Sequence, residues 1–321
     1  MKTLSIPAEI SQALPHVTAV SISISGGKDS QAMQRAVMAQ VTAPRFDLVH
    51  ADLGRAEWPQ TPQFVERMGL EVDLPVNVVQ RVKGDLVQRI EERLDTVSTI
   101  DGTKPAKPFW PSAAQRYCTS DLKRGPIQKH QRTLCKDGLI ISCAGMRAQE
   151  SSNRSKLPTV KVESALTSKP YKDLSPEAAI QAWLDNDKQG RLVLLWLPIH
   201  DWTEDEVWES LGSSQEDVER RRDLYRSGRG AEALTGWQAH PACVFGNQRL
   251  SCALCVLAGC GDLCNVGERH RERCAKYVEL EDRSGYTFKA GMSLKDLPAN
   301  PHSLPIVSEE PAEQPCQLCL F

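Results

Sequence analysis

The chain has 321 residues, 40% of them hydrophobic and 25% charged, so it can bury the core of one large domain and a smaller appendage. A formal net charge of −2 provides no overall field that would attract a nucleic acid or a membrane. No segment approaches the ~20 consecutive apolar residues of a membrane span, and residues 1–7 lack the apolar stretch of a signal peptide. We therefore expect a cytoplasmic protein with no membrane partner.

The first predicted strand leads directly into a glycine-rich turn. Residues 17–24 are rich in β-branched side chains, residues 25–30 read Ser-Gly-Gly-Lys-Asp-Ser, and residues 31–40 contain no Gly or Pro and suit a helix. A strand, a glycine turn and a helix N-terminus together form a cradle for phosphate, because free N–H groups and the helix dipole favour an anion. An ordinary turn between strand and helix is the alternative interpretation.

Each residue of this turn has a predicted role. Lys28 adds a positive charge, and Asp29 or Ser30 can hold Mg²⁺ against phosphate oxygens. The predicted catalytic residues here are Lys28 and Asp29, and the predicted nucleotide-binding residues are Ser25, Gly26, Gly27 and Ser30.

Strands and helices continue to alternate through the first half of the chain, which is typical of a doubly wound parallel sheet. We expect further strands at residues 45–52, 72–79, 139–144 and 191–198, and helices at residues 62–68 and 85–94. Thr203 and Glu206 form a capping-box pattern at the start of a later helix. Glu57 follows the second strand and is predicted to contact the adenosine end of a nucleotide or a metal ion.

Cationic side chains that suit anion binding follow in two later segments. Residues 116–127 include Lys123, and residues 145–154 include Arg147 and Arg154, whose planar guanidinium groups match phosphate or sulfate oxygens. We predict that Arg147 is catalytic and that Lys123 and Arg154 bind the nucleotide. A surface ion pair between Arg147 and Glu150 is the alternative interpretation of that arginine.

The cysteines are unevenly placed, since eight of the eleven lie between residues 243 and 319. From Cys252 onward their spacing is C-x2-C-x4-C-x3-C. Disulfides are rare in the cytosol, so this pattern indicates a metal, a cluster or thiol chemistry. Four-cysteine zinc and an iron–sulfur cluster are both consistent with the spacing.

Residues 25–30, 116–127, 145–154 and 196–208 together resemble the phosphoadenosine phosphosulfate (PAPS) reductase family. That family belongs to the adenine nucleotide α-hydrolase superfamily, whose pyrophosphate (PP) loop grips ATP while it is split between the α and β phosphates. The chain is also similar to the ATP-dependent sulfurtransferases of DNA phosphorothioation. The resemblance implies a Rossmann-like α/β fold, with a doubly wound, mostly parallel sheet and a C-terminal cysteine-rich appendage of helices and loops.

This resemblance also suggests a division of the chain. We expect a PP-loop nucleotide-binding domain at residues 1–211 and a cysteine-rich metal or cluster region at residues 212–296. A flexible proline-rich tail at residues 297–321 would carry Cys316 and Cys319.

In relatives, a [4Fe–4S] cluster is held by cysteines that match Cys118, Cys252 and Cys255 of this sequence. The resemblance therefore implies such a cluster here, with Cys260 as the fourth ligand ahead of Cys264, and Zn²⁺ as the alternative metal. This chain departs from the cluster-bearing reductases at one position, because Thr119 follows Cys118 where they have a second cysteine.

The intact loop favours ATP, brought with Mg²⁺, over PAPS, because reductases resemble a degenerate form of this loop. We expect adenylation of an acceptor with release of pyrophosphate, followed by sulfur transfer. The sulfur donor would be a cysteine desulfurase or a thioredoxin-like protein, and a nucleic acid is one candidate acceptor. The alternatives are a thiol-dependent reductase of PAPS or adenylyl sulfate, and a non-catalytic nucleotide-binding subunit.

Overall fold

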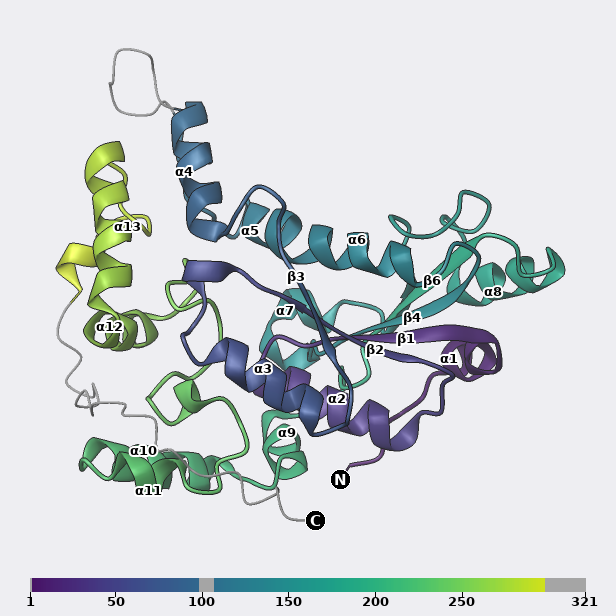
Figure 1. Ribbon diagram of the computed structural model, residues 1–321, viewed down its shortest axis with the longest axis horizontal. Helices are drawn as coiled ribbons and strands as arrows, with labels where there is room; N and C mark the ends of the chain where they lie inside the picture. Colours follow the sequence, from purple (N-terminus) through teal and green to yellow (C-terminus); the bar gives the residue numbers. More distant parts are fainter. Residues whose placement is uncertain (1, 98–106, 298–321) are drawn as a thin grey trace.

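A computed structural model describes residues 2–97 and 107–297 of the chain (Figure 1). Residues 98–106 lie outside the described residues; the sequence of residues 98–112, rich in Lys and Pro, predicts a loop. The predicted tail lies outside them as well from residue 298 onward, together with Cys316 and Cys319.

The described residues form one six-stranded sheet with the strand order β3-β2-β1-β4-β6-β5. Every neighbouring pair is parallel except β5 and β6, which are antiparallel. This arrangement confirms the predicted α/β fold with a doubly wound, mostly parallel sheet. The strands are β1 (Val17–Ser23), β2 (Phe46–Ala51), β3 (Val76–Val79), β4 (Gly138–Ala144), β5 (Val160–Val162) and β6 (Arg191–Trp196).

Helices cover both faces of the sheet, with α2 and α3 on one face and α6 on the other (Figure 1). Right-handed crossovers require this placement, because the chain runs from β1 out to β3 and then returns past β1 to form β4. The α-helices are α1 (Ala8–Ala13), α2 (Lys28–Gln40), α3 (Thr61–Leu70), α4 (Leu86–Val97), α5 (Tyr117–Thr119), α6 (Gly125–Leu134), α7 (Ser152–Ser155), α8 (Pro176–Asp185), α9 (Glu204–Ser210), α10 (Gln215–Arg226), α11 (Gly230–Leu234), α12 (Cys260–Arg269) and α13 (Arg271–Ser284).

The strand order reverses between β1 and β4. The chain leaves β1 toward β2 on one side, whereas β4 leads toward β6 on the other. In open α/β sheets, ligands bind in the crevice beyond the carboxyl ends of the strands at such a reversal. The ends of β1 and β4 therefore define where a site is expected.

A buried hydrogen-bond network, called here the Asp47 network, crosses the middle of the sheet. The Asp47 carboxylate in β2 accepts hydrogen bonds from Ser21 Oγ in β1 at 2.8 Å and from His130 Nε2 in α6 at 2.9 Å. Gln131 Nε2, also in α6, donates to Ser21 Oγ at 3.1 Å and to Ser142 Oγ in β4 at 2.8 Å. The network thus joins three adjacent strands to the helix that covers them.

The structure differs from the predicted strands in two places. The strand expected at residues 72–79 is wrong at its start, because β3 begins only at Val76. The chain before it forms a tight turn, in which Asp73 has a φ of 53° and the Gly69 carbonyl accepts hydrogen bonds from the N–H groups of Val72 and Leu74. The sequence also gave no prediction of β5, which pairs with β6 at the sheet edge.

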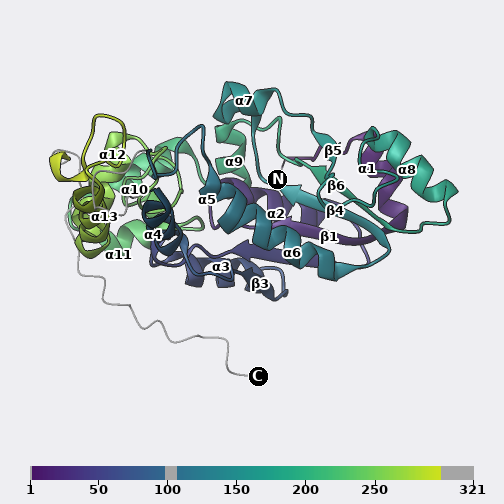
Figure 2. The same ribbon diagram turned by 90° about the horizontal axis from the view of Figure 1, so that it is seen from above.

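The cysteine-rich part packs closely on the part of the chain that precedes residue 212. Buried residues on both sides of residue 212, such as Ile22 and Met33 on one side and Phe245 and Leu280 on the other, belong to one continuous apolar cluster. Figures 1 and 2 both place α12 and α13 beside α4, at the end of the molecule opposite α1 and α8. Within the described ranges, no helix is both long enough and apolar enough to span a membrane.

Candidate functional site

The predicted phosphate loop lies where β1 ends and α2 begins. Ser30 Oγ accepts a hydrogen bond from the Ser25 N–H at 3.1 Å and donates to the Gly27 carbonyl at 2.9 Å, which folds the loop around the first turn of α2. Gly26 has a φ of 77°, a conformation that favours glycine. Among the described residues, no side chain caps α2, so its first N–H groups remain for an anion.

Gly145 brings the end of β4 against this loop. A Cβ atom at this glycine would lie 3.0 Å from the Asp29 carbonyl oxygen and 3.1 Å from the Ser30 Cα, which is closer than ordinary packing. The absence of a side chain therefore allows the β4 loop to reach the first turn of α2. This contact places Arg147, two residues later, beside Asp29.

Arg147 is almost fully buried, at 4% exposed, and its Nε donates to Asp29 Oδ1 at 2.5 Å. Glu150 bonds to the backbone N–H of Arg147 at 3.0 Å, not to its guanidinium group. The alternative of a surface ion pair between Arg147 and Glu150 is therefore wrong. The strand order explains the difference, because it brings Asp29 within reach of a residue 118 positions later.

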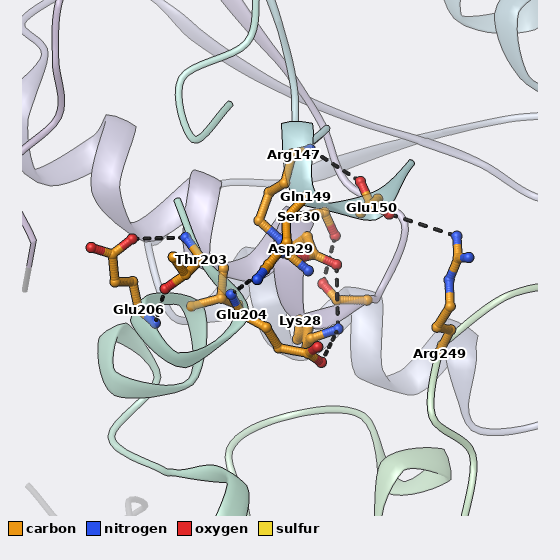
Figure 3. Close-up of polar contacts among 12 residues, drawn as sticks. Lys28, Asp29, Ser30, Arg147, Gln149, Glu150, Thr203, Glu204, Glu206 and Arg249 are labelled. Atoms are coloured by element: carbon orange, nitrogen blue, oxygen red, sulfur yellow. Dashed lines mark hydrogen bonds and ion pairs between the residues drawn. The ribbon is translucent and has the colours of Figure 1, made fainter. Parts of the chain in front are cut away.

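Five polar groups close into a ring over the start of α2 (Figure 3). Lys28 Nζ lies 3.6 Å from Asp29 Oδ2 and 3.2 Å from Glu204 Oε1. Arg147 joins Asp29 to Gln149, donating from Nη1 to the Gln149 Oε1 at 2.8 Å. The same amide oxygen accepts the Glu204 N–H at 2.8 Å, which completes the ring. We call these five residues the Lys28 ring.

A segment of the cysteine-rich part, residues 246–252, lies across the phosphate loop. The Leu250 side chain comes within 3.6 Å of the position that a Cβ atom on Gly26 would take. Arg249 Nη2 lies 3.7 Å from Glu150 Oε1 (Figure 3). The other oxygen of Glu150 accepts a hydrogen bond from Arg154. Residues on both sides of residue 212 thus contribute to the site.

These residues border a cleft of about 990 Å³. The structure brings most of the predicted site residues to it, and leaves Gly26, Cys118, Cys255 and Cys260 off its lining. The predicted residues that line the cleft are Ser25, Gly27, Lys28, Asp29, Ser30, Glu57, Lys123, Arg147, Arg154 and Cys252.

His50 and Glu57 form a buried pair in the cleft wall. His50 Nδ1 donates to the Ile24 carbonyl at 2.9 Å, and its Nε2 lies 3.4 Å from Glu57 Oε2. Burial acts to lower the pKa of His50, but the hydrogen bond and charge of Glu57 outweigh it and raise the pKa above its usual value. His50 was not predicted from the sequence, although a residue near the carboxyl end of a parallel strand is a candidate for the site.

The predicted cluster cysteines are only partly brought together. Burial raises the pKa of Cys252 to about 11, Lys123 acts against this, and the nearby thiols of Cys255 and Cys118 raise it further. Cys260 is exposed, and its Sγ lies 3.3 Å from the sulfur of Met292. In the part of the chain that the structure describes, no three His, Cys, Asp or Glu side chains are placed to hold one metal ion.

A buried tyrosine lies close to this group of cysteines. The Tyr277 hydroxyl is buried and has no hydrogen-bond partner among the described residues. Burial raises the pKa of Tyr277, and the charges of Cys252 and Cys255 add to this effect. Buried hydroxyls normally have a partner, and a group bound beside Cys252 and Cys255 would supply one. Cys260, exposed beside Met292, is not grouped with them.

Comparison with known proteins gives the class of the chain. The family model described as the phosphoadenosine phosphosulfate reductase domain matches residues 19–255, which is more than half of the sequence. The chain therefore belongs to the PAPS reductase family, and the resemblance found in its motifs is confirmed.

A solved structure to which the chain is similar is the phosphoadenylyl-sulfate (PAPS) reductase from Candida auris in a phosphate complex. The two share 13% sequence identity with a TM-score of 0.35, over 60% of this chain and 71% of that chain. A search of curated proteins finds no match to this chain.

Proposed function

We propose that this protein binds ATP in the cleft and cleaves it between the α and β phosphates, so that an acceptor is adenylated for sulfur transfer. The observation that carries the proposal is the intact phosphate loop, with Lys28, Asp29 and Arg147 in contact at the uncapped start of α2. A substrate without a β,γ-pyrophosphate has no need for this arrangement.

In the proposed reaction, an acceptor oxygen attacks the α-phosphorus. The bond from that phosphorus to the bridging oxygen breaks, and pyrophosphate leaves with the electron pair. Lys28, Arg147 and the free N–H groups of α2 would stabilise the charge that develops on the leaving group. Mg²⁺ would arrive with ATP as part of the substrate.

The second step would replace AMP with sulfur. The outer sulfur of a persulfide on a donor such as a cysteine desulfurase or a thioredoxin-like protein attacks the adenylated acceptor, and AMP leaves. A second thiol of the donor then attacks the resulting disulfide, which releases the thiolated acceptor and leaves a disulfide on the donor. Arg116 and Lys123 also line the cleft and suit an anionic acceptor such as a nucleic acid. The sulfur donor and the acceptor remain predictions.

An iron–sulfur cluster also remains a prediction. We propose Cys118, Cys252 and Cys255 as its ligands, supported by their mutual electrostatic contact and the unpartnered hydroxyl of Tyr277 beside them. The measurement is the iron and acid-labile sulfide content of anaerobically purified protein. Zinc without sulfide would favour the alternative metal.

A second candidate function is reduction of PAPS or adenylyl sulfate. The specific observation in its favour is Cys252, whose thiol lines the same cleft as Lys28. In that reaction two thiols are oxidised to a disulfide, and the sulfate group is released as sulfite.

The deciding experiment supplies anaerobic protein and Mg²⁺ with ATP, or with PAPS and a dithiol, and assays pyrophosphate and sulfite side by side. We expect pyrophosphate from ATP and a decrease of about 100-fold in Asp29→Ala, because Arg147 loses the carboxylate that positions it. The exposed Asp173→Ala is the matched control and should retain activity. Sulfite without pyrophosphate would favour the reductase, and ATP binding without turnover would favour a non-catalytic subunit.

A further inference from the structure

The charge of Lys28, which the proposed function assigns to the phosphates of ATP, is already neutralised within the protein. Its side chain is 8% exposed, and two carboxylates lie within 4 Å of its ammonium group. The Lys28 ring contains two positive and two negative side chains, so it has no net charge to offer an incoming anion. A nucleotide phosphate therefore competes with these carboxylates for Lys28.

The two carboxylates are not held equally. Asp29 is 20% exposed and is fixed by the buried guanidinium group of Arg147 at 2.5 Å. The Glu204 side chain is 38% exposed, and among the described residues the only charged group that contacts it is Lys28. Glu204 can therefore rotate into solvent at a small cost in free energy. Asp29 cannot move away without leaving the buried guanidinium group of Arg147 without its carboxylate partner, which costs more.

The first turn of α9 positions Glu204 beside Lys28. The capping box fixes the start of α9, since Thr203 Oγ accepts the Glu206 N–H at 3.2 Å and Glu206 accepts the Thr203 N–H at 2.7 Å. The Glu204 N–H is held by Gln149, and one turn later Lys28 Nζ lies 5.7 Å from the centre of the Trp208 ring. Backbone and side chain of this first turn thus both face the phosphate loop.

We propose that Glu204 is a displaceable counter-ion of Lys28, which competes with the substrate and sets a threshold for what binds there. Carboxylate and phosphate oxygens accept the same hydrogen bonds from an ammonium group, so the two exclude each other. A single free phosphate or sulfate gains little by this exchange. A triphosphate or pyrophosphate also bonds to the α2 N–H groups and can displace Glu204. Because this cost is the same for every anion that reaches Lys28, only an anion with further contacts of this kind retains a useful affinity. This inference rests on the proposed function.

The test measures binding of Mg-ATP, magnesium pyrophosphate and sulfate by calorimetry to the full chain and its variants. Glu204→Gln keeps the size of the side chain and removes the competing charge. We expect pyrophosphate to bind about two- to fivefold tighter, as the loss of one partly exposed ion pair implies, and sulfate to gain at least as much. Asp205→Asn, in the same helix turn and exposed, removes an equal charge and should leave both affinities unchanged.

The same substitution in a Lys28→Met protein distinguishes competition at Lys28 from a general effect of charge. In Lys28→Met the gain from Glu204→Gln should vanish, because there is no ammonium group to release. Equal or weaker pyrophosphate binding by Glu204→Gln, with a normal wild-type affinity, would overturn this inference and leave the proposed function standing. No binding of ATP or pyrophosphate by the wild type would overturn both. Melting curves without ligand confirm that each variant is folded.

Discussion

Gly145 shows how a single residue sets the geometry of the site. Its backbone lies against the first turn of α2, where a Cβ atom would meet the Asp29 carbonyl oxygen at 3.0 Å. We expect Gly145→Ala to lower the free energy of unfolding by about 1–3 kcal/mol, because neither backbone can move away easily. It should also weaken ATP binding by separating Arg147 from Asp29.

Urea unfolding and ATP titration of the same variant check this prediction. Gly259→Ala is the matched control, since a Cβ atom there meets nothing within 4 Å. An unchanged midpoint for Gly145→Ala would show that the two loops are not in contact in solution.

Single residues of the site were predictable where they belong to a local motif. Lys28, Asp29 and Ser30 follow a strand and two glycines, and this pattern indicates an anion site without any tertiary information. Glu204 and His50 carry no such signal. Their proximity to the loop depends on strand order and on how α9 packs against α2, which residue spacing does not encode.

At the scale of the element, α9 depends on its N-terminal cap. Thr203 and Glu206 satisfy each other's backbone N–H groups, as the sequence pattern predicts. We expect Thr203→Ala to lower the free energy of unfolding by about 1 kcal/mol and to loosen Glu204 at Lys28. Chemical denaturation measures the first effect and pyrophosphate titration the second.

Thr203→Ser retains a hydroxyl acceptor and should restore most of the stability. If Thr203→Ala and Thr203→Ser were equally stable, the cap would contribute nothing to α9.

Elements with a strong pattern were predicted to within a few residues, whereas short ones were not. The strands β1, β2, β4 and β6 are buried on both faces, so apolar and β-branched residues predominate in each and identify it as a strand. β5 has only three residues and lies at the sheet edge, where neither length nor alternation identifies a strand. The start of β3 was misplaced because Val72 and Leu74 belong to a turn, although both are apolar.

Whole-molecule stability should fall as the solution becomes acidic. Burial, with a smaller contribution from Arg67, lowers the pKa of His240 to about 3. The neutral ring accepts the Ala242 N–H at Nδ1 and lies 3.3 Å from Thr61 Oγ1. Because the unfolded chain binds the proton more tightly, this contribution is complete above pH 6.5 and is lost as the pH falls toward 3.

From pH 7.5 to 5.5, His240 alone should lower the free energy of unfolding by about 1.4 kcal/mol. His270, with a pKa lowered to about 4 by burial and by Arg273, acts in the same direction, whereas His50, with its raised pKa, acts in the opposite one. Urea midpoints at the two pH values measure the change. His240→Gln should have a shallower pH dependence, and an equal slope in both proteins would contradict this assignment.

The family could be predicted from the whole sequence, but the packing of residues 246–252 against the phosphate loop could not. Motifs spread over residues 25–208 indicate the fold, and the family match over residues 19–255 confirms it. Leu250 lies over Gly26 and Arg249 beside Glu150, yet the members of each pair are far apart in the sequence. Nothing local in residues 246–252 points to the phosphate loop, so a single sequence does not reveal that contact.

The Asp47 network has a consequence for how the sheet assembles. Apolar strands that are covered on both faces tolerate slippage, since one valine or isoleucine replaces another with little penalty. A slip of one residue between β1 and β2, however, would separate the buried Asp47 carboxylate from Ser21 and cost about 1.5–3 kcal/mol, the contribution of one hydrogen bond to a charged group. The network therefore makes the native register of the central strands lower in free energy than a register shifted by one residue.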